Sequence, residues 1–262
     1  MLAAQRMPQQ RKTPVRRILA AALPLAGFMV LSQAALAAPC TFESKAGAAA
    51  NPKQLNILLI GGSGMIGSRV LDEASSRGHC VIAASRHPEK IKAGANVKAV
   101  KLDATDKENF TAEAKKVDVI VSATSPRGGG DPAAEAKAVG DTEIAVAKAT
   151  GKRLMVVGGA GSLMLPDGRA VVDTLPKQYQ GEARAMKSVL ESLKASDIDW
   201  TFFSPAMSIA PGKKTSKYQT GTTTVLFDAN KKSAISAEDF ADALVNELEK
   251  PAHKRSQMTV AY

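Results

Sequence analysis

Short apolar runs separated by longer amphipathic stretches dominate the chain after residue 54. These runs are almost continuously apolar, which is typical of parallel strands whose two faces are both covered by helices. The expected strands are Leu55–Ile60, Val81–Ala84, Val97–Leu102, Val117–Ala123, Leu154–Val157, Trp200–Ser204 and a closing strand Gln257–Tyr262.

The segments between these runs show helical spacing of their apolar residues. The expected helices are Ile66–Ser76, Lys107–Lys116, Ala133–Ala149, Gly181–Ala195 and a last helix that begins after Ser236 and ends near Lys250. Strands and helices alternating at this rhythm predict a Rossmann-type, doubly wound α/β fold with a mostly parallel sheet and helices on both faces. At this length a single domain is expected.

The first 37 residues differ in character from the rest. Residues 1–17 carry five basic and no acidic side chains, Ile18–Leu31 is apolar, and Ala35-Leu36-Ala37 has the small residues of a cleavage site. This order predicts a signal peptide over residues 1–37, a linker over 38–54 and the α/β domain over 55–262. The apolar run is shorter than the roughly 20 residues that span a bilayer, so no stable membrane span is expected after cleavage.

The leader also predicts where the protein works. Export, with a periplasmic location, is expected either by ordinary secretion or by the twin-arginine route, with which Arg16-Arg17 is compatible. The leader carries much of the basic charge, because its removal lowers the formal net charge from +10 to +5. The remaining Lys and Arg are interspersed with Asp and Glu, so a nucleic-acid partner is not expected.

The cysteines and histidines of the sequence predict no catalytic or metal site. Cys40 and Cys80 could pair in an oxidising compartment, but the favoured interpretation is an exposed Cys40 and a buried, unpaired Cys80. Neither a C-x-x-C motif nor a His/Cys cluster predicts a metal site. The three histidines, His79, His87 and His253, are expected on the solvated surface.

A glycine-rich turn joins the first expected strand to the first expected helix. The segment consists of Gly61, Gly62, Ser63, Gly64, Met65, Ile66 and Gly67. It contains G-x-G-x-x-G between strand and helix, the context in which this pattern predicts dinucleotide binding. The glycines allow a tight turn, close approach of a diphosphate to the backbone, and close packing of the helix on the strand, while the helix N-terminus attracts the negative charge.

The end of the second strand indicates which dinucleotide binds. NAD-selective sites carry an acidic residue there, whereas this strand ends at Ser85-Arg86. A guanidinium suits the 2′-phosphate of NADP, so NADP is the expected cofactor, with NAD possible. Asp103, after the third strand, is either an acceptor for the adenine amino group or a turn residue.

Several further segments resemble a known family. GGSGMIGSR from residue 61, LDATD from 102, VVGGAGSL from 156, DWTFFSPA from 199 and the terminal MTVAY are similar to the atypical short-chain dehydrogenase/reductases. The most similar group is the NAD(P)H-binding flavin reductase and biliverdin reductase B-like branch, over residues 55 to 262. This resemblance implies a Rossmann core and hydride transfer from NADPH to a flavin, a quinone-like compound or another small planar acceptor.

The resemblance also implies where the site lies. Ala123 and Thr124, which end the fourth strand, would flank the ribose and nicotinamide. Ser162, in the GGAGSL motif, and Tyr179 are the candidate catalytic residues, and Tyr218 is a further candidate for stacking or proton donation. The glycine-rich stretch 126–130 would form a flap over the site or be merely a slack loop.

One departure from the family pattern affects the chemistry. Short-chain dehydrogenases use Tyr-x-x-x-Lys as a proton relay, and no tyrosine of this chain has a lysine four positions later. This weakens the case for alcohol dehydrogenation and for nucleotide-sugar epimerisation. It weakens flavin reduction less, because hydride passes directly to the ring. The alternative is a non-catalytic NADP(H)-binding redox sensor or partner-binding protein.

Overall fold

The computed structural model describes residues 40–42 and 54–262. The expected signal peptide and most of the expected linker lie outside these residues. The main sheet contains β1 (Asn56–Ile60), β2 (Cys80–Ser85), β3 (Val97–Lys101), β4 (Val119–Ser122), β5 (Arg153–Val157), β6 (Trp200–Ser204), β8 (Gln219–Gly221) and β10 (Ser256–Ala261).

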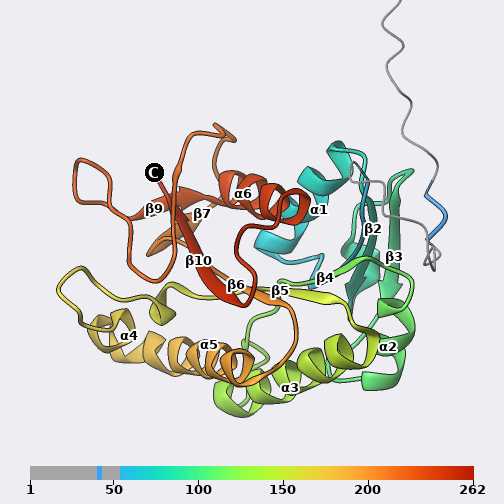
Figure 1. Ribbon diagram of the computed structural model, residues 1–262, viewed down its shortest axis with the longest axis horizontal. Helices are drawn as coiled ribbons and strands as arrows, with labels where there is room; N and C mark the ends of the chain where they lie inside the picture. Colours follow the sequence, from blue (N-terminus) through green and yellow to red (C-terminus); the bar gives the residue numbers. More distant parts are fainter. Residues whose placement is uncertain (1–39, 43–53) are drawn as a thin grey trace, which may run out of the picture. The chain divides into compact units, whose positions relative to one another are not determined.

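The strands run in the order β3-β2-β1-β4-β5-β6-β10-β8. All neighbouring pairs are parallel except β10 and β8, which are antiparallel. The order reverses between β1 and β4, and such a switch point leaves a crevice at the carboxyl ends of the strands, where ligands bind. The expected doubly wound, mostly parallel fold is therefore confirmed (Figure 1).

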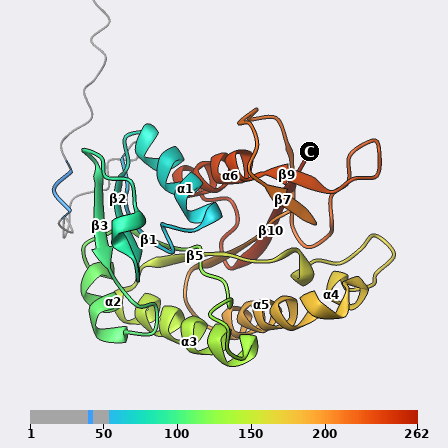
Figure 2. The same ribbon diagram turned by 180° about the vertical axis from the view of Figure 1, so that it is seen from behind.

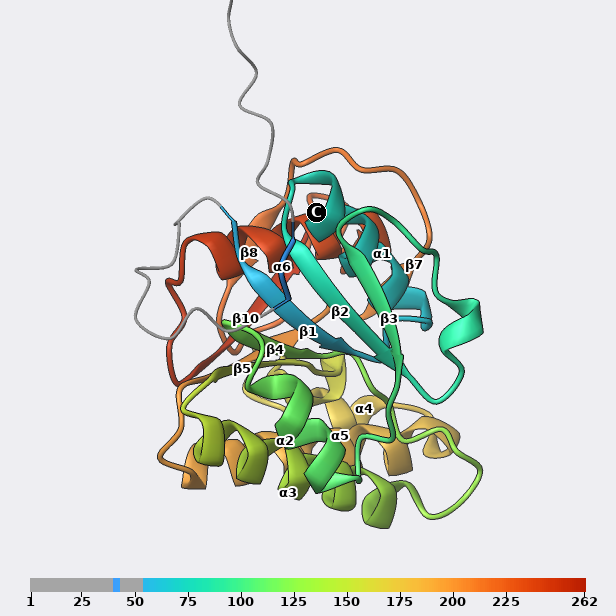
Figure 3. The same cartoon turned by 90° about the vertical axis from the view of Figure 1, so that its right-hand side faces the viewer.

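Helices cover both faces of the sheet (Figures 1 and 3). One face carries α1 (Met65–Ser76) and α6 (Ala237–Glu249), which pack against each other. The opposite face carries α2 (Lys107–Ala114), α3 (Pro132–Thr150) and α5 (Lys177–Ala195), with the short α4 (Val171–Thr174) just before α5. Seen from behind, α3 and α5 lie side by side beneath the sheet (Figure 2).

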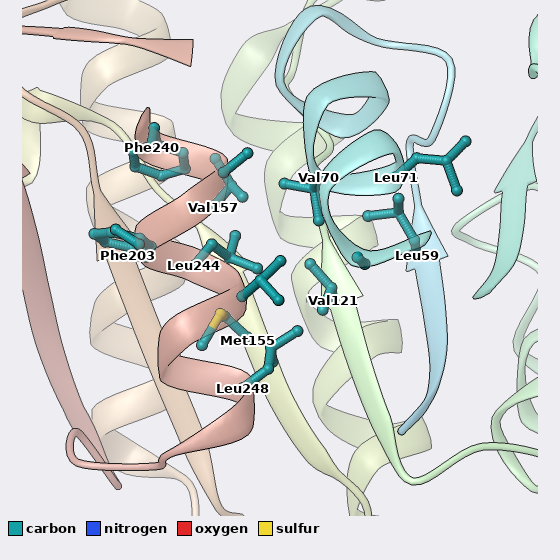
Figure 4. Packing of buried hydrophobic residues seen from close by; sticks show 14 of the residues in the cluster. Leu59, Val70, Leu71, Val121, Met155, Val157, Phe203, Phe240, Leu244 and Leu248 are labelled. Atoms are coloured by element: carbon teal, nitrogen blue, oxygen red, sulfur yellow. The ribbon is translucent and has the colours of Figure 1, made fainter. Parts of the chain in front are cut away.

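Two apolar layers explain why the strands are continuously apolar. Alternate strand residues, such as Leu59 and Phe203, face α1 and α6 (Figure 4), while their neighbours Leu58 and Phe202 face α3 and α5. The Phe203 ring stacks on Phe240 of α6, with ring centroids 4.3 Å apart. Because both faces of the central strands β1, β2, β4, β5 and β6 are buried, an alternating polar pattern is absent from them, whereas the edge strand β3 carries the exposed Lys98 and Lys101.

The structure adds short elements that the sequence pattern does not reveal. β7 (Ser208–Ala210) and β9 (Ala234–Ser236) form a separate two-stranded parallel sheet, and 3₁₀ turns occupy Pro88–Lys90 and Ala160–Ser162. The two small strands have three residues each, too few for a recognisable hydrophobic period. Their pairing depends on tertiary contacts.

A disulfide joins Cys40 to Cys80, with their Cα atoms 5.6 Å apart. The favoured interpretation of the two cysteines as unpaired was therefore wrong, and the pairing alternative is correct. Cys80 is buried at the start of β2, as expected, but its sulfur is bonded to the segment that precedes the domain. The bridge closes a loop of 40 residues, and loops of this size give a stabilisation of roughly 2–4 kcal/mol.

Of the three histidines, His79 is buried, His253 is half-buried and His87 is exposed. His79 is 1% exposed, accepts a hydrogen bond from the Leu55 amide at 3.1 Å and contacts Glu249 of α6 at 3.0 Å. His253 contacts the buried Glu247 at 2.9 Å. His87 is exposed, as expected. Polar partners supplied by α6 make the burial of the first two possible, and the local sequence does not show them.

Candidate cofactor site

The glycine turn fits tightly between the ends of β2 and β4. Gly61 has a φ of +81°, which favours glycine, and both Gly61 and Gly62 donate their amides to the Ala84 carbonyl, at 2.9 and 3.2 Å. A Cβ on Gly61 would lie 2.6 Å from the Ala123 oxygen. Glycine is therefore required at position 61, because the main chain of the turn lies directly against the main chain at the end of β4.

Helix α1 begins at this turn with its amides uncapped. Gly64 is the N-cap residue and offers no side-chain hydrogen bond, and the first turn contains no acidic residue. The first bond of the helix runs from Ser68 N to Gly64 O, so the amides of Met65, Ile66 and Gly67 have no acceptor within it. These amides and the positive end of the helix dipole form an anion-binding site.

Gly67 and Gly64 have different roles. A Cβ on Gly67 would lie 2.1 Å from the Gly61 oxygen, so glycine is required there for the helix to pack on the turn. A Cβ on Gly64 would meet only the Gly61 oxygen, at 3.3 Å. Gly64 therefore keeps a space clear on the ligand side of the turn.

The end of β2 lies beside the turn. The Ser85 hydroxyl is 2.8 Å from that of Ser63 and accepts from the His87 amide at 3.1 Å, so it links the two loops. The Arg86 side chain is exposed and close enough to Asp103 to lower the pKa of that carboxyl. The ends of β2 and β3 therefore bring Arg86 and Asp103 close to each other.

Asp103 serves mainly to shape its own turn. Its Oδ1 accepts hydrogen bonds from the Thr105 amide at 2.9 Å and from the Thr105 hydroxyl at 2.7 Å. These hydrogen bonds are the main cause of its lowered pKa. The geometry favours the turn-residue alternative, in which the carboxylate holds the loop after β3 in place.

Strand β4 ends directly against the glycine turn. The Ala123 amide donates to the Ile60 carbonyl at 2.9 Å, and the Thr124 hydroxyl lies 3.0 Å from that of Ser122. Ala123 and Thr124 therefore stand at the carboxyl edge beside Gly61, as the resemblance implies for residues that flank a nicotinamide ribose. Gly61 and the end of β4 form one wall of the candidate site.

Ser162 lies at the carboxyl end of β5 but within a buried polar cluster. It is 8% exposed and donates to the Gly159 carbonyl at 2.7 Å. Its oxygen accepts from the Gln257 side chain at 2.9 Å and lies 2.8 Å from that of Ser204. The single hydroxyl proton of Ser162 is therefore already engaged in a hydrogen bond within the protein.

The two tyrosine candidates have different surroundings. Tyr179 is 56% exposed in the first turn of α5. Tyr218 donates to Asp242 of α6 at 2.6 Å and accepts from Asn246 at 2.8 Å. Burial, together with the Asp242 carboxylate, raises the pKa of Tyr218. Tyr218 thus fastens the segment 211–218 to α6.

The glycine-rich loop after β4 is tied down at two points. The Gly128 amide donates to the Glu135 carboxylate, at 3.0 and 3.2 Å, and the Arg127 guanidinium pairs with Glu182 of α5 at 2.8 Å. Gly129, with a φ of +92°, allows the turn between these contacts and α3. The loop therefore has a defined path over the edge of α3 and α5.

Comparison with known proteins agrees with this geometry. Residues 61–251, which begin at the glycine turn, match the NAD(P)H-binding family.

The chain belongs to the NAD(P)H-binding family.

Similar solved structures come from several bacteria. A proposed exported protein of Burkholderia pseudomallei is 40% identical, with a TM-score of 0.72 over 79% of this chain and 100% of that one. A proposed epimerase of Bacteroides thetaiotaomicron is 37% identical, with a TM-score of 0.74 over 79% and 96%. A proposed NADH-flavin reductase of Streptococcus pneumoniae is 27% identical, with a TM-score of 0.68 over 79% and 99%. The resemblance to NAD(P)H-binding reductases is confirmed.

The residues of this chain fit the cofactor of the NAD(P)H-binding family. The unpaired amides of α1, the absence of an acidic side chain from its first turn and the space beside Gly64 suit a diphosphate. Thr124, at the carboxyl end of β4, would then be among the residues that hold the nicotinamide half. None of the helices in the described part of the chain has the length and apolar character that crossing a bilayer requires.

One residue of functional interest was missed from the sequence. Glu143 of α3 is 1% exposed and fully enclosed, and burial raises its pKa to about 7, although a hydrogen bond with Ser122 counteracts the rise. A signal was present, because Glu143 falls on the helical stripe of small and apolar residues. The buried members of that stripe are Ala136, Gly140, Glu143, Val146 and Ala147.

Substitutions at Gly64 and Gly67 separate cofactor binding from folding. Gly64→Ala should change the free energy of unfolding by less than about 1 kcal/mol, yet weaken NADPH binding at least about tenfold, because the methyl group fills the diphosphate space. Gly67→Ala should cost about 3 kcal/mol of stability, because its methyl group overlaps the Gly61 carbonyl. Chemical denaturation measures the stability of each variant, and calorimetry measures its affinity for NADPH. Unchanged NADPH affinity in a folded Gly64→Ala variant would contradict the assignment of this space to the diphosphate.

Proposed function

We propose that this protein is a reductase that uses NADPH to reduce a flavin or a similar small planar acceptor. Bound reduced nicotinamide supplies the hydride, and the protein supplies position, exclusion of water and a proton. The similar Streptococcus pneumoniae protein, at 27% identity, is a proposed NADH-flavin reductase, which supports this choice of acceptor. The missing Tyr-x-x-x-Lys motif argues against the epimerase chemistry proposed for another relative.

Exposed methionines at the carboxyl edge carry the acceptor proposal. Met65 follows β1, Met164 follows β5 and Met207 follows β6, and they are 42%, 37% and 44% exposed. Because these strands are parallel, all three residues belong to segments that leave the carboxyl ends of the strands, the edge at which the glycine turn lies. Methionine is flexible and polarisable and packs well against aromatic rings. Such a rim suits a flat, apolar acceptor better than a sugar, which needs many hydrogen-bond partners.

Steady-state oxidation of NADPH with riboflavin, FMN or a simple quinone tests the proposed activity. We expect turnover with at least one acceptor. Met164→Ser should raise the acceptor KM several-fold without changing the Kd for NADPH, because the proposed role of this side chain is to pack against the acceptor and not the cofactor. Tight NADPH binding with no turnover of any planar acceptor would contradict the reductase and favour the alternative of a non-catalytic NADP(H)-binding protein.

We further propose that NADP is preferred over NAD. The support is the exposed Arg86 at the end of β2 and the absence of a carboxylate at the end of that strand. A charge-assisted hydrogen bond of this kind contributes about 1.5–3 kcal/mol, so Arg86→Ala should weaken NADPH binding roughly tenfold or more. NADH binding should stay within about twofold, because NADH has no 2′-phosphate. Equal losses for both nucleotides, measured by calorimetry, would show that Arg86 does not contact that phosphate.

Export is proposed from three observations. The leader has the order of a signal peptide, a disulfide joins Cys40 to Cys80, and a 40% identical relative is a proposed exported protein. Disulfides persist mainly in oxidising compartments such as the bacterial periplasm. Mass spectrometry of the protein recovered from its native host should find an N-terminus after Ala37 and a linked Cys40–Cys80 peptide. An intact leader on a reduced, cytoplasmic protein would disprove export.

A further inference from the structure

A small cavity of about 20 Å³ lies below the carboxyl end of β4, between α3 and α5. Thr124 and Ser125 line it from the loop after β4, Glu143 lines it from α3, and Val156 and Met186 close it from β5 and α5. A cavity of this size has room for about one water molecule. It therefore connects the interior of the helical layer with the residues expected beside the nicotinamide.

Glu143 is the unusual member of this lining. Its side chain is almost completely buried, and its Oε1 has no hydrogen-bond partner among the described residues. An unpaired carboxyl oxygen in an apolar layer is costly, so such a group calls for an explanation. Because burial raises the pKa of Glu143 to about 7, a substantial fraction of the molecules holds a proton there at neutral pH.

Two hydroxyl groups connect this carboxyl to the cofactor edge. Ser122, fully buried at the end of β4, is close enough to Glu143 to lower the pKa of that carboxyl, and its Oγ lies 3.0 Å from Oγ1 of Thr124. Thr124 in turn lies against the glycine turn, since its amide nitrogen would be 3.4 Å from a Cβ on Gly61. Hydroxyls both donate and accept, so a chain of them can pass a proton.

We propose that Glu143 supplies the proton for acceptor reduction and delivers it through the hydroxyls of Ser122 and Thr124. This inference rests on the proposed reductase function. It assigns to a buried helix residue the task that Tyr-x-x-x-Lys performs elsewhere. Glu143 touches neither cofactor nor acceptor and acts through the two hydroxyls.

The reaction balances with this proton. Reduction of a flavin or quinone by two electrons requires one hydride and one proton, and NADPH gives the hydride and becomes NADP⁺. The O–H bond of Glu143 breaks, each hydroxyl accepts one proton and releases its own, and a new N–H or O–H bond forms on the acceptor. Glu143 is left as a carboxylate and recovers a proton from solvent through the cavity.

Two other candidate proton donors are already hydrogen-bonded within the protein. The Ser162 hydroxyl donates a hydrogen bond to the Gly159 carbonyl, and the Tyr218 hydroxyl donates one to the Asp242 carboxylate. Of the described residues that line the cavity, Glu135 is the other titratable one, and its carboxylate accepts from the Gly128 amide. The lining residues from β5 and α5 are Val156, Met186 and Val189, which do not titrate. Among the described residues of the lining, the Glu135 carboxylate is therefore the one titratable neighbour of Glu143.

The Glu143→Gln variant keeps the shape of the side chain and removes its acid. In the wild type, kcat for the acceptor should fall as the pH rises above about 7, because the protonated acid is lost. Glu143→Gln should lose this pH dependence, with kcat lower by about tenfold or more at pH 6 and the Kd for NADPH unchanged. Ser122→Ala should show the same loss, because it interrupts the chain while leaving the acid in place.

A second measurement does not depend on turnover. Glu143 in the folded state has a higher pKa than the ordinary value near 4.3, so the folded protein binds an extra proton between about pH 4.3 and 7. Stability should therefore decrease as the pH rises through this window, and Glu143→Gln should flatten that decrease. Glu191→Gln, an exposed α5 residue paired with Lys194, is the matched control and should keep both the wild-type kcat profile and the wild-type stability slope.

The outcomes distinguish the two proposals. If the wild type reduces an acceptor and Glu143→Gln has the same pH dependence of kcat, the proposed proton relay from Glu143 through Ser122 and Thr124 is wrong, and the reductase function stands. If the stability slopes of wild type and Glu143→Gln coincide, Glu143 does not titrate as proposed and the relay is again wrong. If the wild type binds NADPH but reduces no acceptor while the slopes differ, the proposed function fails, and the relay fails with it.

Discussion

The site depends on contact between main-chain atoms at the glycine turn. Gly61 sits against the Ala123 carbonyl at the end of β4, and Gly67 brings the first turn of α1 against Gly61 itself. No side chain fits in either place. This contact fixes the direction of α1 and therefore the direction in which its free amides point. It also fixes the end of β4, where the cofactor and the proton path are expected to meet.

The sheet order determines what gathers around this contact. Because β1 and β4 are neighbours whose connections leave on opposite faces, their carboxyl ends open a crevice between the loops. Segments distant in sequence then lie at one edge: the glycine turn, Ser85-Arg86, Thr124 and the loops that follow β5 and β6. The α6 side of the molecule is instead stabilised by polar contacts, among them Arg77 with Asp242 at 2.8 Å and Arg153 with Glu247 at 2.7 Å.

Two buried glutamates, Glu247 and Glu143, differ in whether hydrogen bonds compensate for their burial, and this difference sets their protonation. Burial would raise the pKa of Glu247, yet hydrogen bonds from His253 and Arg153 hold that pKa below its usual value. Glu247 is therefore a structural ion. Glu143 is also buried, but it receives no hydrogen bond from a cationic side chain of the described residues. Its carboxyl group therefore remains protonated at a pH where that of Glu247 is ionised. The same residue type has two electrostatic states because its neighbours differ.

The sequence by itself determined the order of strands and helices, the Rossmann-type fold and the glycine turn. It could do so because continuous apolar runs, helical spacing and glycine placement are local consequences of backbone geometry and burial. The positions of Arg86 and Thr124 directly after expected strands could be predicted for the same reason, since strand ends of a parallel sheet share an edge. The short strands β7, β8 and β9 could not be predicted, because three residues give no period.

Only the tertiary structure decided which side chains meet. It paired Cys40 with Cys80, buried His79 against α6 and enclosed the Ser162 hydroxyl in a polar cluster. It also placed Glu143 under the end of β4, beside a cavity and two linked hydroxyls. Contacts of this kind join residues far apart in the chain, and the free energy of a buried charge depends on every group around it. A linear pattern of residues contains neither the long-range contacts nor the surroundings of a buried charge. For this reason the fold was predictable from the sequence and the proposed proton path was not.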